Sequence, residues 1–295
     1  MNKNTHDAPS HHKRHKWNFF MDMLILIFSI FLFLFLSSCG NKTSSQLTVD
    51  ILKVGKADAS VFRCGDSCMV IDCGEADDGQ DIVTFLQDAG VSTVDVLIVT
   101  HFDKDHVGGV PAVLEQMEID RILIPDYEGT GTAYENFMNV LSEHHLSAER
   151  LTEITTLTLG DMTVQIEPSD IEIPEASEEE YDNDMSLITT IIHGNMRLLF
   201  TGDIEAARTE SWLASGDVQH CQLIKMPHHG RYNEQTSSLL DAVSADVAVI
   251  CCSEKNPADD ETMTALEERS ITVWQTRYGD VHIESNGQKL KVTQP

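Results

Sequence analysis

The sequence has no glycine-rich phosphate loop, no Gly-x-Ser-x-Gly nucleophile elbow and no internal repeat with a period of about 20 to 50 residues. Without the elbow, hydrolysis by a Ser/His/Asp triad has no support. A chain of 295 residues is long enough for one large or two small domains. We expect one catalytic domain, because nothing in the sequence marks an internal boundary.

Basic residues are scarce. The chain has 20 lysines and arginines against 48 aspartates and glutamates, which gives a net charge of −28 at pH 7. Such a field repels polyanions over a Debye length of about 8 Å at physiological salt. Extended binding of nucleic acid is therefore not expected, although a local cationic site can still hold one phosphate. Much of the negative charge lies in residues 170–184, which we interpret as a solvated loop.

The seven cysteines include no Cys-x-x-Cys pair, and this argues against structural zinc. Cys64 and Cys68 flank a short polar turn between two strand-like runs. Outside the cytoplasm such a pair can be oxidised, so the sequence leaves two alternatives, a disulfide across the turn or two free thiols.

The N-terminus has the features of a targeting segment. Lys13, Arg14 and Lys16 precede an uncharged apolar run over residues 23–36. This run is shorter than the roughly 20 residues of a spanning helix, but it suits a secretory signal peptide. It ends in Leu-Ser-Ser-Cys-Gly, which resembles the lipobox of bacterial lipoproteins, with Cys39 as the lipid-modified residue.

We therefore expect a lipoprotein signal peptide over residues 1–39, a short linker over 40–46 and one folded domain over 47–295. The domain would lie outside the cytoplasm, held at the membrane by a lipid on Cys39. An uncleaved signal anchor is the alternative, and it also directs the domain outward.

Alternating strand and helix patterns follow the linker. Strands are expected at residues 47–54, 60–63, 69–72 and 94–99, and helices at 81–89, 109–117 and 133–144. A hairpin over 187–201 is expected to turn at Gly194-Asn195. Strand-rich halves with interleaved helices predict an α/β fold of two packed sheets covered by helices, a four-layer sandwich.

Four short segments concentrate the residues that can bind metal, and each follows an apolar strand. Donors on loops held by rigid strands are what a preorganised metal site requires. A charged surface loop would account for one such cluster but not for several in the same position relative to strands. The segments are residues 71–74, 101–106, 201–203 and 227–230.

These segments resemble motifs of the metallo-β-lactamase superfamily, and most closely those of the hydrolase domain of ComEC-type competence proteins. Residues 54–59 are similar to the VGQGDA opening of that group, and residues 100–109 to its SHPDxDHxGG motif. Residues 183–187, 201–203 and 227–230 are similar to its N-x-x-S-L, TGD and HHGS segments. The resemblance spans residues 47–284 and implies the four-layer αββα sandwich of that superfamily.

The resemblance also implies a site for two divalent metal ions. The first ion would be bound by His101 and Asp103, and the second by Asp105 and His106. Asp203 would bridge the two ions. The expected metal ligands are His101, Asp103, Asp105, His106, Asp203 and His228.

One histidine of the His228-His229 pair would complete the ligand set. We favour His228 as the ligand, and a swap with His229 stays open. The resemblance gives Asp105, Asp203 and His229 catalytic roles, and Asp58, Asp72 and Asn183 supporting positions behind the ligands.

Three carboxylates and three imidazoles make either zinc or manganese a suitable metal. Two divalent ions against three carboxylates leave a charge of about +1, which favours a small anionic or phosphodiester substrate attacked by a metal-activated hydroxide. We therefore expect an extracytoplasmic, monomeric phosphodiesterase or nuclease-like hydrolase. The alternatives are a lactam, lactone or ester hydrolase of the same fold, and a non-catalytic metal-binding lipoprotein.

The sequence departs from the competence-protein pattern near the expected substrate cleft. Arg231 replaces a serine, and Ala57 replaces a glycine. Residues 256–259 read Asn-Pro-Ala-Asp where that group tends to have an asparagine followed by a histidine-proline pair. Fold and metals are therefore better supported by the resemblance than the substrate is.

Overall fold

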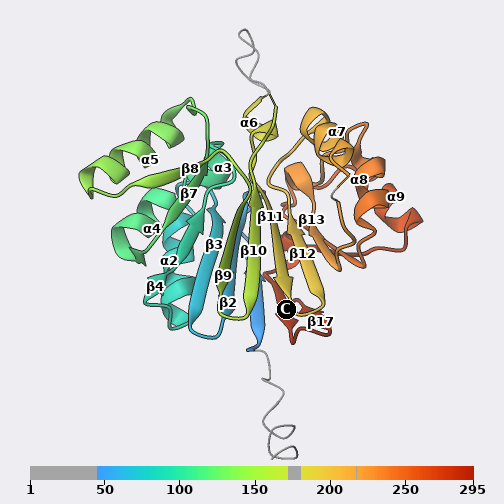
Figure 1. Ribbon diagram of the computed structural model, residues 1–295, viewed down its shortest axis with the longest axis horizontal. Helices are drawn as coiled ribbons and strands as arrows, with labels where there is room; N and C mark the ends of the chain where they lie inside the picture. The colour runs from blue at the N-terminus through green and yellow to red at the C-terminus, as the bar shows by residue number, and fades with distance from the viewer. Residues whose placement is uncertain (1–44, 172–180, 217) are drawn as a thin grey trace, which may run out of the picture. The chain divides into compact units, whose positions relative to one another are not determined.

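Two β-sheets stacked face to face form the centre of the protein, and helices cover both outer faces (Figure 1). The computed structural model describes residues 45–171, 181–216 and 218–295. The expected signal peptide, Cys39 and most of the linker lie outside the described residues. This arrangement confirms the predicted four-layer α/β sandwich.

The first sheet has eight strands in the order β17-β16-β1-β2-β3-β5-β7-β8. Strands β3, β5, β7 and β8 run parallel to one another, and the rest are antiparallel. A separate pair, β4 (Thr93–Val94) and β6 (Glu118–Ile119), lies beside it. The strands are β1 (Leu47–Ile51), β2 (Ala59–Cys64), β3 (Ser67–Cys73), β5 (Val96–Ile98), β7 (Ile122–Pro125), β8 (Ala148–Leu151), β16 (Val281–Ser285) and β17 (Leu290–Thr293).

The second sheet has seven strands in the order β15-β14-β13-β12-β11-β10-β9. Strands β12 to β15 are parallel, whereas β9 to β12 are antiparallel. The expected hairpin is β11 and β12, turning at Gly194 and Asn195. The strands are β9 (Thr155–Leu159), β10 (Met162–Glu167), β11 (Ile188–His193), β12 (Met196–Phe200), β13 (Leu223–Lys225), β14 (Val247–Ile250) and β15 (Thr272–Gln275).

Helices α2, α4 and α5 cover the first sheet, and α7, α8 and α9 cover the second (Figure 1). Among the described residues, no helix combines the length and the apolar character that crossing a membrane requires. The helices are α2 (Gly79–Asp88), α3 (Lys104–Val107), α4 (Val110–Gln116), α5 (Thr132–Glu143), α6 (Tyr181–Asp184), α7 (Ala206–Ala214), α8 (Thr236–Val243) and α9 (Asp260–Glu268), with 3₁₀ turns η1 (Pro227–Gly230) and η2 (Thr276–Tyr278).

Apolar side chains fill the space between the sheets and the space under each helical layer. Phe62 of β2 and Phe200 of β12 meet edge to face between the sheets, with ring centroids 4.9 Å apart. Successive residues of a strand point to opposite faces of its sheet. One face of each sheet packs against the other sheet and the other face packs against helices, so the strands carry apolar residues on both faces.

This alternation settles the question of Cys64 and Cys68. Cys64 packs between the two sheets, whereas Cys68 packs under the helices on the other face of the first sheet. The β2–β3 register pairs Cys64 with Ser67 and Cys68 with Arg63. Both cysteines are free and buried, so no disulfide crosses this turn.

The parallel strands determine where the site lies. The carboxyl ends of β3 and β5 meet at one edge of the first sheet, and those of β12 and β13 meet at one edge of the second. The four donor segments follow these four strands. The fold therefore gathers them at a single edge of the sandwich.

Candidate metal centre

His101 and His106 lie at the centre of the site, and both side chains are fully buried. His101 follows β5, and His106 lies in the short helix α3 that begins at Lys104. The loop is tied to its surroundings because the Asp105 carbonyl accepts a hydrogen bond of 3.0 Å from the Asp58 amide. The imidazole rings of His101 and His106 lie 4.1 Å apart between centroids.

Asp72, at the end of β3, holds this loop from behind. Its carboxylate accepts hydrogen bonds from the Thr100 amide (2.8 Å) and the Thr100 hydroxyl (2.7 Å). Its Oδ2 also lies 2.8 Å from Nδ1 of His106. A carboxylate on Nδ1 leaves Nε2 of the same ring available to a metal. This is the supporting position that the sequence predicts for Asp72.

Asp203 and His229 bring the second sheet into contact with the loop. Oδ2 of Asp203 lies 3.3 Å from Nε2 of His106 and 3.0 Å from Nε2 of His229. Nε2 of His229 in turn lies 3.3 Å from Oδ2 of Asp105. All four side chains are buried, and Asp203 lies between the two histidines.

These distances fit a metal centre. Two donors that share a tetrahedral ion at about 2.1 Å lie roughly 3.4 Å from each other. Nε2 of His101 and Nε2 of His106 are buried and make no hydrogen bond, which is costly unless an ion binds there. His101, His106 and Asp203 form one candidate group of ligands, and Asp105, His106 and His229 form another.

Asp103 lies at the rim of this centre. Its Oδ2 is 3.8 Å from Nε2 of His101, and its side chain is 46% exposed. It falls outside the tight clusters of candidate ligands, although a shared ion with His101 is compatible with this spacing. The next side chain, Lys104, is 70% exposed and pairs with Glu75.

The geometry favours His229 over His228 as the ligand. Both residues adopt positive φ, 45° and 54°, so the chain turns sharply between them. His229 faces the cluster, whereas Nδ1 of His228 lies 3.0 Å from Oε1 of Glu205. The His228 side chain is 31% exposed. His228, which the sequence analysis favoured, is not brought into the cluster.

Asn183 lies beside His228. Its amide nitrogen donates a 3.0 Å hydrogen bond to Oε1 of Glu205, the atom that also faces His228. Asn183 therefore supports the rim rather than the buried ligands. The amide of Asp203 receives its support from Ser186, whose hydroxyl accepts a hydrogen bond of 3.1 Å.

Lys225 is the functional residue that the sequence analysis missed. Its fully buried Nζ pairs with Asp58 and lies 3.2 Å from Oδ1 of Asp203 and 3.1 Å from the carbonyl oxygen of Gly202. A lysine at the end of the apolar strand β13 was the available signal. Asp58, placed by the sequence in a supporting position, is linked through Lys225 to Asp203.

The charges of the cluster are mutually dependent. Burial lowers the pKa of His101, and neighbouring His106 lowers it further, to about 3. Burial alone would lower the pKa of His229, but Asp203 and Asp105 raise it to about 10. Against the effect of burial, His229, His106 and Lys225 hold the pKa of Asp203 well below its usual range. Without ions, protonated histidines supply the positive charge.

Lys56 adds a further cation at the edge of the cluster. Its Nζ lies 2.6 Å from Oδ2 of Asp105, and its side chain is partly exposed. Burial opposes the charged form, but Asp105 raises the pKa of Lys56 above its usual value.

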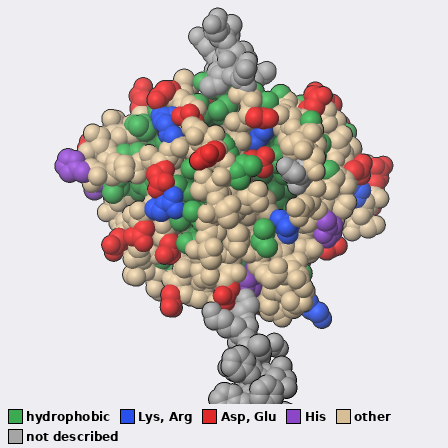
Figure 2. Space-filling model, in the orientation of Figure 1, with side chains coloured by type: hydrophobic (Ala, Val, Ile, Leu, Met, Phe, Trp, Pro, Cys, Tyr) green, Lys and Arg blue, Asp and Glu red, His purple; other side chains and the backbone are tan. Residues whose placement is uncertain are grey.

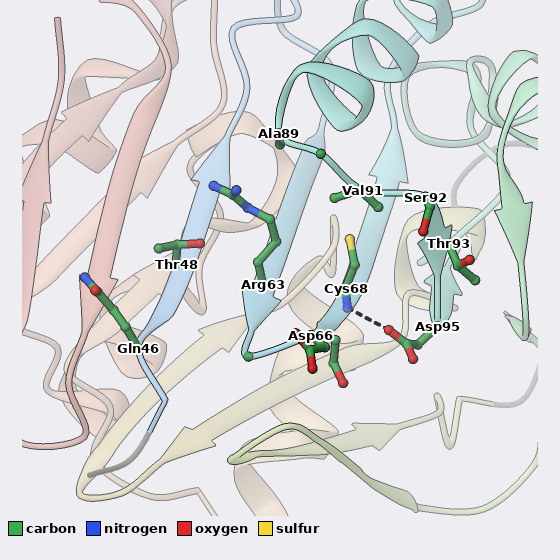
Figure 3. Close-up of a pocket in the computed structure, with 13 residues that line it drawn as sticks. Gln46, Thr48, Arg63, Asp66, Cys68, Ala89, Val91, Ser92, Thr93 and Asp95 are labelled. Carbon is green, nitrogen blue, oxygen red and sulfur yellow. Dashed lines mark hydrogen bonds between the residues drawn. The ribbon is translucent and has the colours of Figure 1, made fainter.

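A large cavity lies elsewhere. It has a volume of about 610 Å³ and is formed around the β2–β3 turn and the residues that follow α2 (Figure 3). Cys68 lines it, and the Cys68 amide donates a 2.7 Å hydrogen bond to Asp95. Cys68 is near the start of β3 and Asp72 near its end, so this cavity is separate from the metal centre.

Comparison with known protein families finds a match for part of the chain. Residues 52–179 match the family model of the metallo-beta-lactamase superfamily. The match confirms the resemblance expected from the sequence over this part of the chain, and the fold expected from the sequence is confirmed as well.

The chain is 27% identical over 212 residues to Competence protein ComA of Neisseria gonorrhoeae, covering 70% of this chain and 27% of the relative. The chain is 23% identical over 198 residues to ComE operon protein 3 of Bacillus subtilis, covering 66% of this chain and 25% of the relative. It is 25% identical over 240 residues to Recombination protein 2 of Haemophilus influenzae, covering 80% and 27%. The chain thus spans about a quarter of the length of these relatives.

A solved structure shows the same fold. The metallo-beta-lactamase fold protein YhfI from Bacillus subtilis superposes with a TM-score of 0.58 at 12% identity. The match covers 81% of this chain and all of that one. At this identity the likeness supports the fold alone.

Proposed function

We propose that the protein is a metal-dependent phosphodiesterase with nuclease-like chemistry, acting outside the cytoplasm. The observation that carries the proposal is the buried cluster of donors from both sheets, in which the Nε2 atoms of His101 and His106 make no hydrogen bond. The proposed ligands are His101, Asp103, Asp105, His106, Asp203 and His229.

Two divalent ions, zinc or manganese, would activate water and offset the negative charge that develops on a phosphoryl group. The residues of the chain hold this arrangement. Asp72 and Thr100 orient the loop, Lys225 fixes Asp203, and Ser186 holds the Asp203 backbone. Because these groups are already hydrogen-bonded, little reorganisation accompanies the reaction.

The rim supplies a proton donor. His228 is partly exposed beside the buried cluster, and Glu205 holds its ring through Nδ1. An imidazole oriented in this way is suited to protonate the leaving oxygen. We assign this role to His228, with Glu205 and Asn183 as its positioning residues.

The charge of the proposed ions supports an anionic phosphodiester, because the surface of the protein itself repels anions. The visible face carries many scattered carboxylates and few lysines or arginines (Figure 2), so an anionic substrate needs the ions to bind. The name of Recombination protein 2 refers to recombination, a process of DNA, which also favours a phosphodiester.

A hydrolysis panel tests the proposal. Protein freed of metal and reloaded with manganese or zinc is assayed on bis(p-nitrophenyl) phosphate, on linear DNA and on a chromogenic β-lactam. Metal-dependent turnover of the phosphodiester supports the proposal. Turnover of the β-lactam alone, or of none of the three, contradicts it.

The proposed location has its own test. The lipobox-like sequence before Gly40 supports attachment through Cys39. Lipid labelling of the full chain should be lost in Cys39→Ala, and unchanged labelling and processing would contradict the anchor.

A further inference from the structure

A second pocket, of about 490 Å³, lies between the segment after β1 and the segment after β14. Three of the side chains that line it are cations, Lys53, Lys255 and Arg277, and one is an anion, Glu254. For a chain with a net charge of −28 this is an unusual gathering of positive charge.

These three cations differ in their ion pairing from most other lysines and arginines of the protein. In the described parts of the chain most lysines and arginines form an ion pair, including the buried Lys225 and the exposed Lys291. Lys53, Lys255 and Arg277 form no ion pair with any described residue. Asp280 accepts a 2.7 Å hydrogen bond from the Lys53 backbone amide and not from the Lys53 side chain.

Arg277 is held in place. Its Nη2 donates a 2.6 Å hydrogen bond to the Tyr278 hydroxyl, and its guanidinium carbon lies 4.7 Å from the centre of the Tyr278 ring. Its Nε is buried and has no hydrogen-bond partner. A guanidinium that is fixed in this way is suited to an oxyanion, which can accept two of its hydrogen bonds.

The two chain segments that line the pocket continue to residues that contact the metal centre. Gly55 in the pocket directly precedes Lys56, whose Nζ contacts Asp105. On the other wall, the segment that carries Lys255 returns to the ligand turn, where the Asp259 amide donates a 3.1 Å hydrogen bond to the Gly230 carbonyl. Through both segments, the pocket adjoins residues that contact the metal centre.

We propose that this pocket binds a phosphate group of the substrate other than the one at which the ester bond is broken. The proposal rests on the phosphodiesterase function above and narrows its substrate to a phosphodiester that carries at least one more phosphate. Arg277 would bind the phosphate through paired hydrogen bonds, and Lys53 and Lys255 would add positive charge.

Three short oligonucleotides test this with the metal-loaded full chain. The dinucleotides dTpdT and pdTpdT share one scissile bond, but only the second has a terminal phosphate, whereas dTpdTpdT has a second internal diester. We expect KM for pdTpdT to be about tenfold lower than for dTpdT, roughly what one added charge-assisted contact supplies. A similar advantage for dTpdTpdT would assign the pocket to backbone phosphates, and its absence would assign it to terminal ones.

The variant K255A/R277A should abolish this advantage. Lys289→Ala is the matched control, because Lys289 also forms no ion pair but lies outside the pocket, in the turn between β16 and β17. It should keep the tenfold ratio. Equal KM values for dTpdT, pdTpdT and dTpdTpdT in the wild type, or an unchanged ratio in K255A/R277A, would overturn the pocket assignment while leaving the phosphodiesterase function intact.

A binding measurement distinguishes the phosphate-pocket proposal from the phosphodiesterase proposal. The affinity of metal-free protein for pdTpdT is measured by calorimetry, and it should fall about tenfold in K255A/R277A and not in Lys289→Ala. If no oligonucleotide is hydrolysed but this loss is seen, the phosphodiesterase proposal fails and the phosphate pocket stands. An equal affinity in the wild type and K255A/R277A would overturn the pocket.

Discussion

Asp203 is the residue on which the proposed centre most depends. Its Oδ2 lies between His106 and His229, and its Oδ1 faces Lys225. Asp203→Asn keeps the size of the side chain but removes a negative charge from the middle of the proposed ligand set. We expect kcat to fall on the order of a thousandfold, about 4 kcal/mol of transition-state stabilisation, while the fold persists.

Lys104→Ala is the control for this change, since Lys104 is on the same ligand loop but is 70% exposed. Its kcat should stay within about twofold of the wild type. Steady-state kinetics on the phosphodiester identified in the panel measure kcat for both variants. If Lys104→Ala lowers kcat more than Asp203→Asn does, this assignment of the site is wrong.

Lys225 is expected to stabilise the metal-free fold. It is buried between Asp58 and Asp203, so Lys225→Met leaves two buried carboxylates without their cation. Removing one partner of a buried ion pair costs about 3 to 5 kcal/mol, whereas an exposed pair contributes about 0 to 1. Lys291→Met breaks an exposed pair with Glu284 and is the matched control. Urea unfolding of metal-free protein should separate the two variants, and equal losses would contradict the role of Lys225.

The role of His228 depends on the leaving group. A proton donor matters for an alkoxide leaving group and little for p-nitrophenolate, which leaves without protonation. His228→Gln should therefore lower kcat on a dinucleotide by about a hundredfold and on bis(p-nitrophenyl) phosphate by only a few fold. Equal losses on both substrates would show that His228 acts in some other way.

At the scale of the elements, the turn between α3 and α4 holds the ligand loop against β3. Gly109 donates a 3.0 Å hydrogen bond to the Gly74 carbonyl, and a Cβ at this position would overlap the Cys73 carbonyl. Gly109→Ala should therefore lower the free energy of unfolding by about 3 kcal/mol, because backbone has to move. Gly90→Ala, at φ 75° with open space around it, should cost only about 1 kcal/mol. Thermal unfolding of both variants measures the difference, and equal shifts would contradict the packing argument.

The elements also show what could be predicted from sequence. The ligand loops were found because apolar strands end in dense runs of Asp and His, a pattern that is local in the chain. Strands β8 and β9 were missed, because their sequences AERL and TTLTL are short and largely polar. Strand β8 pairs in parallel with β7, which lies before helix α5 in the chain, and no local pattern shows such a pairing. Strand β9 forms a hairpin with β10 through Gly160 and Asp161, a local turn signal that was not used.

The choice between His228 and His229 could not be made from sequence for a related reason. The two side chains are adjacent, and which one faces the cluster depends on two consecutive positive φ angles. Lys225 was missed because a lysine in an apolar strand has no visible partner until Asp58 and Asp203 are brought to it by the fold. Local chemistry was predictable, and contacts between distant segments were not.

At the scale of the whole molecule, the candidate metal ligands come from segments that follow strands of both sheets. The first sheet supplies His101, Asp105 and His106, and the second supplies Asp203 and His229. Ions bound between them would link the sheets at this edge, so metal should raise the thermal stability of the whole domain.

Metal content is the most direct test of the central claim. Metal-free protein is reloaded with manganese or zinc, freed of excess ions and examined by elemental analysis, together with His229→Ala and His228→Ala. The wild type and His228→Ala should hold close to two ions per chain, because His228 faces Glu205, and His229→Ala should lose at least one. No bound metal in the wild type, or loss of metal in His228→Ala with full retention in His229→Ala, would contradict the account.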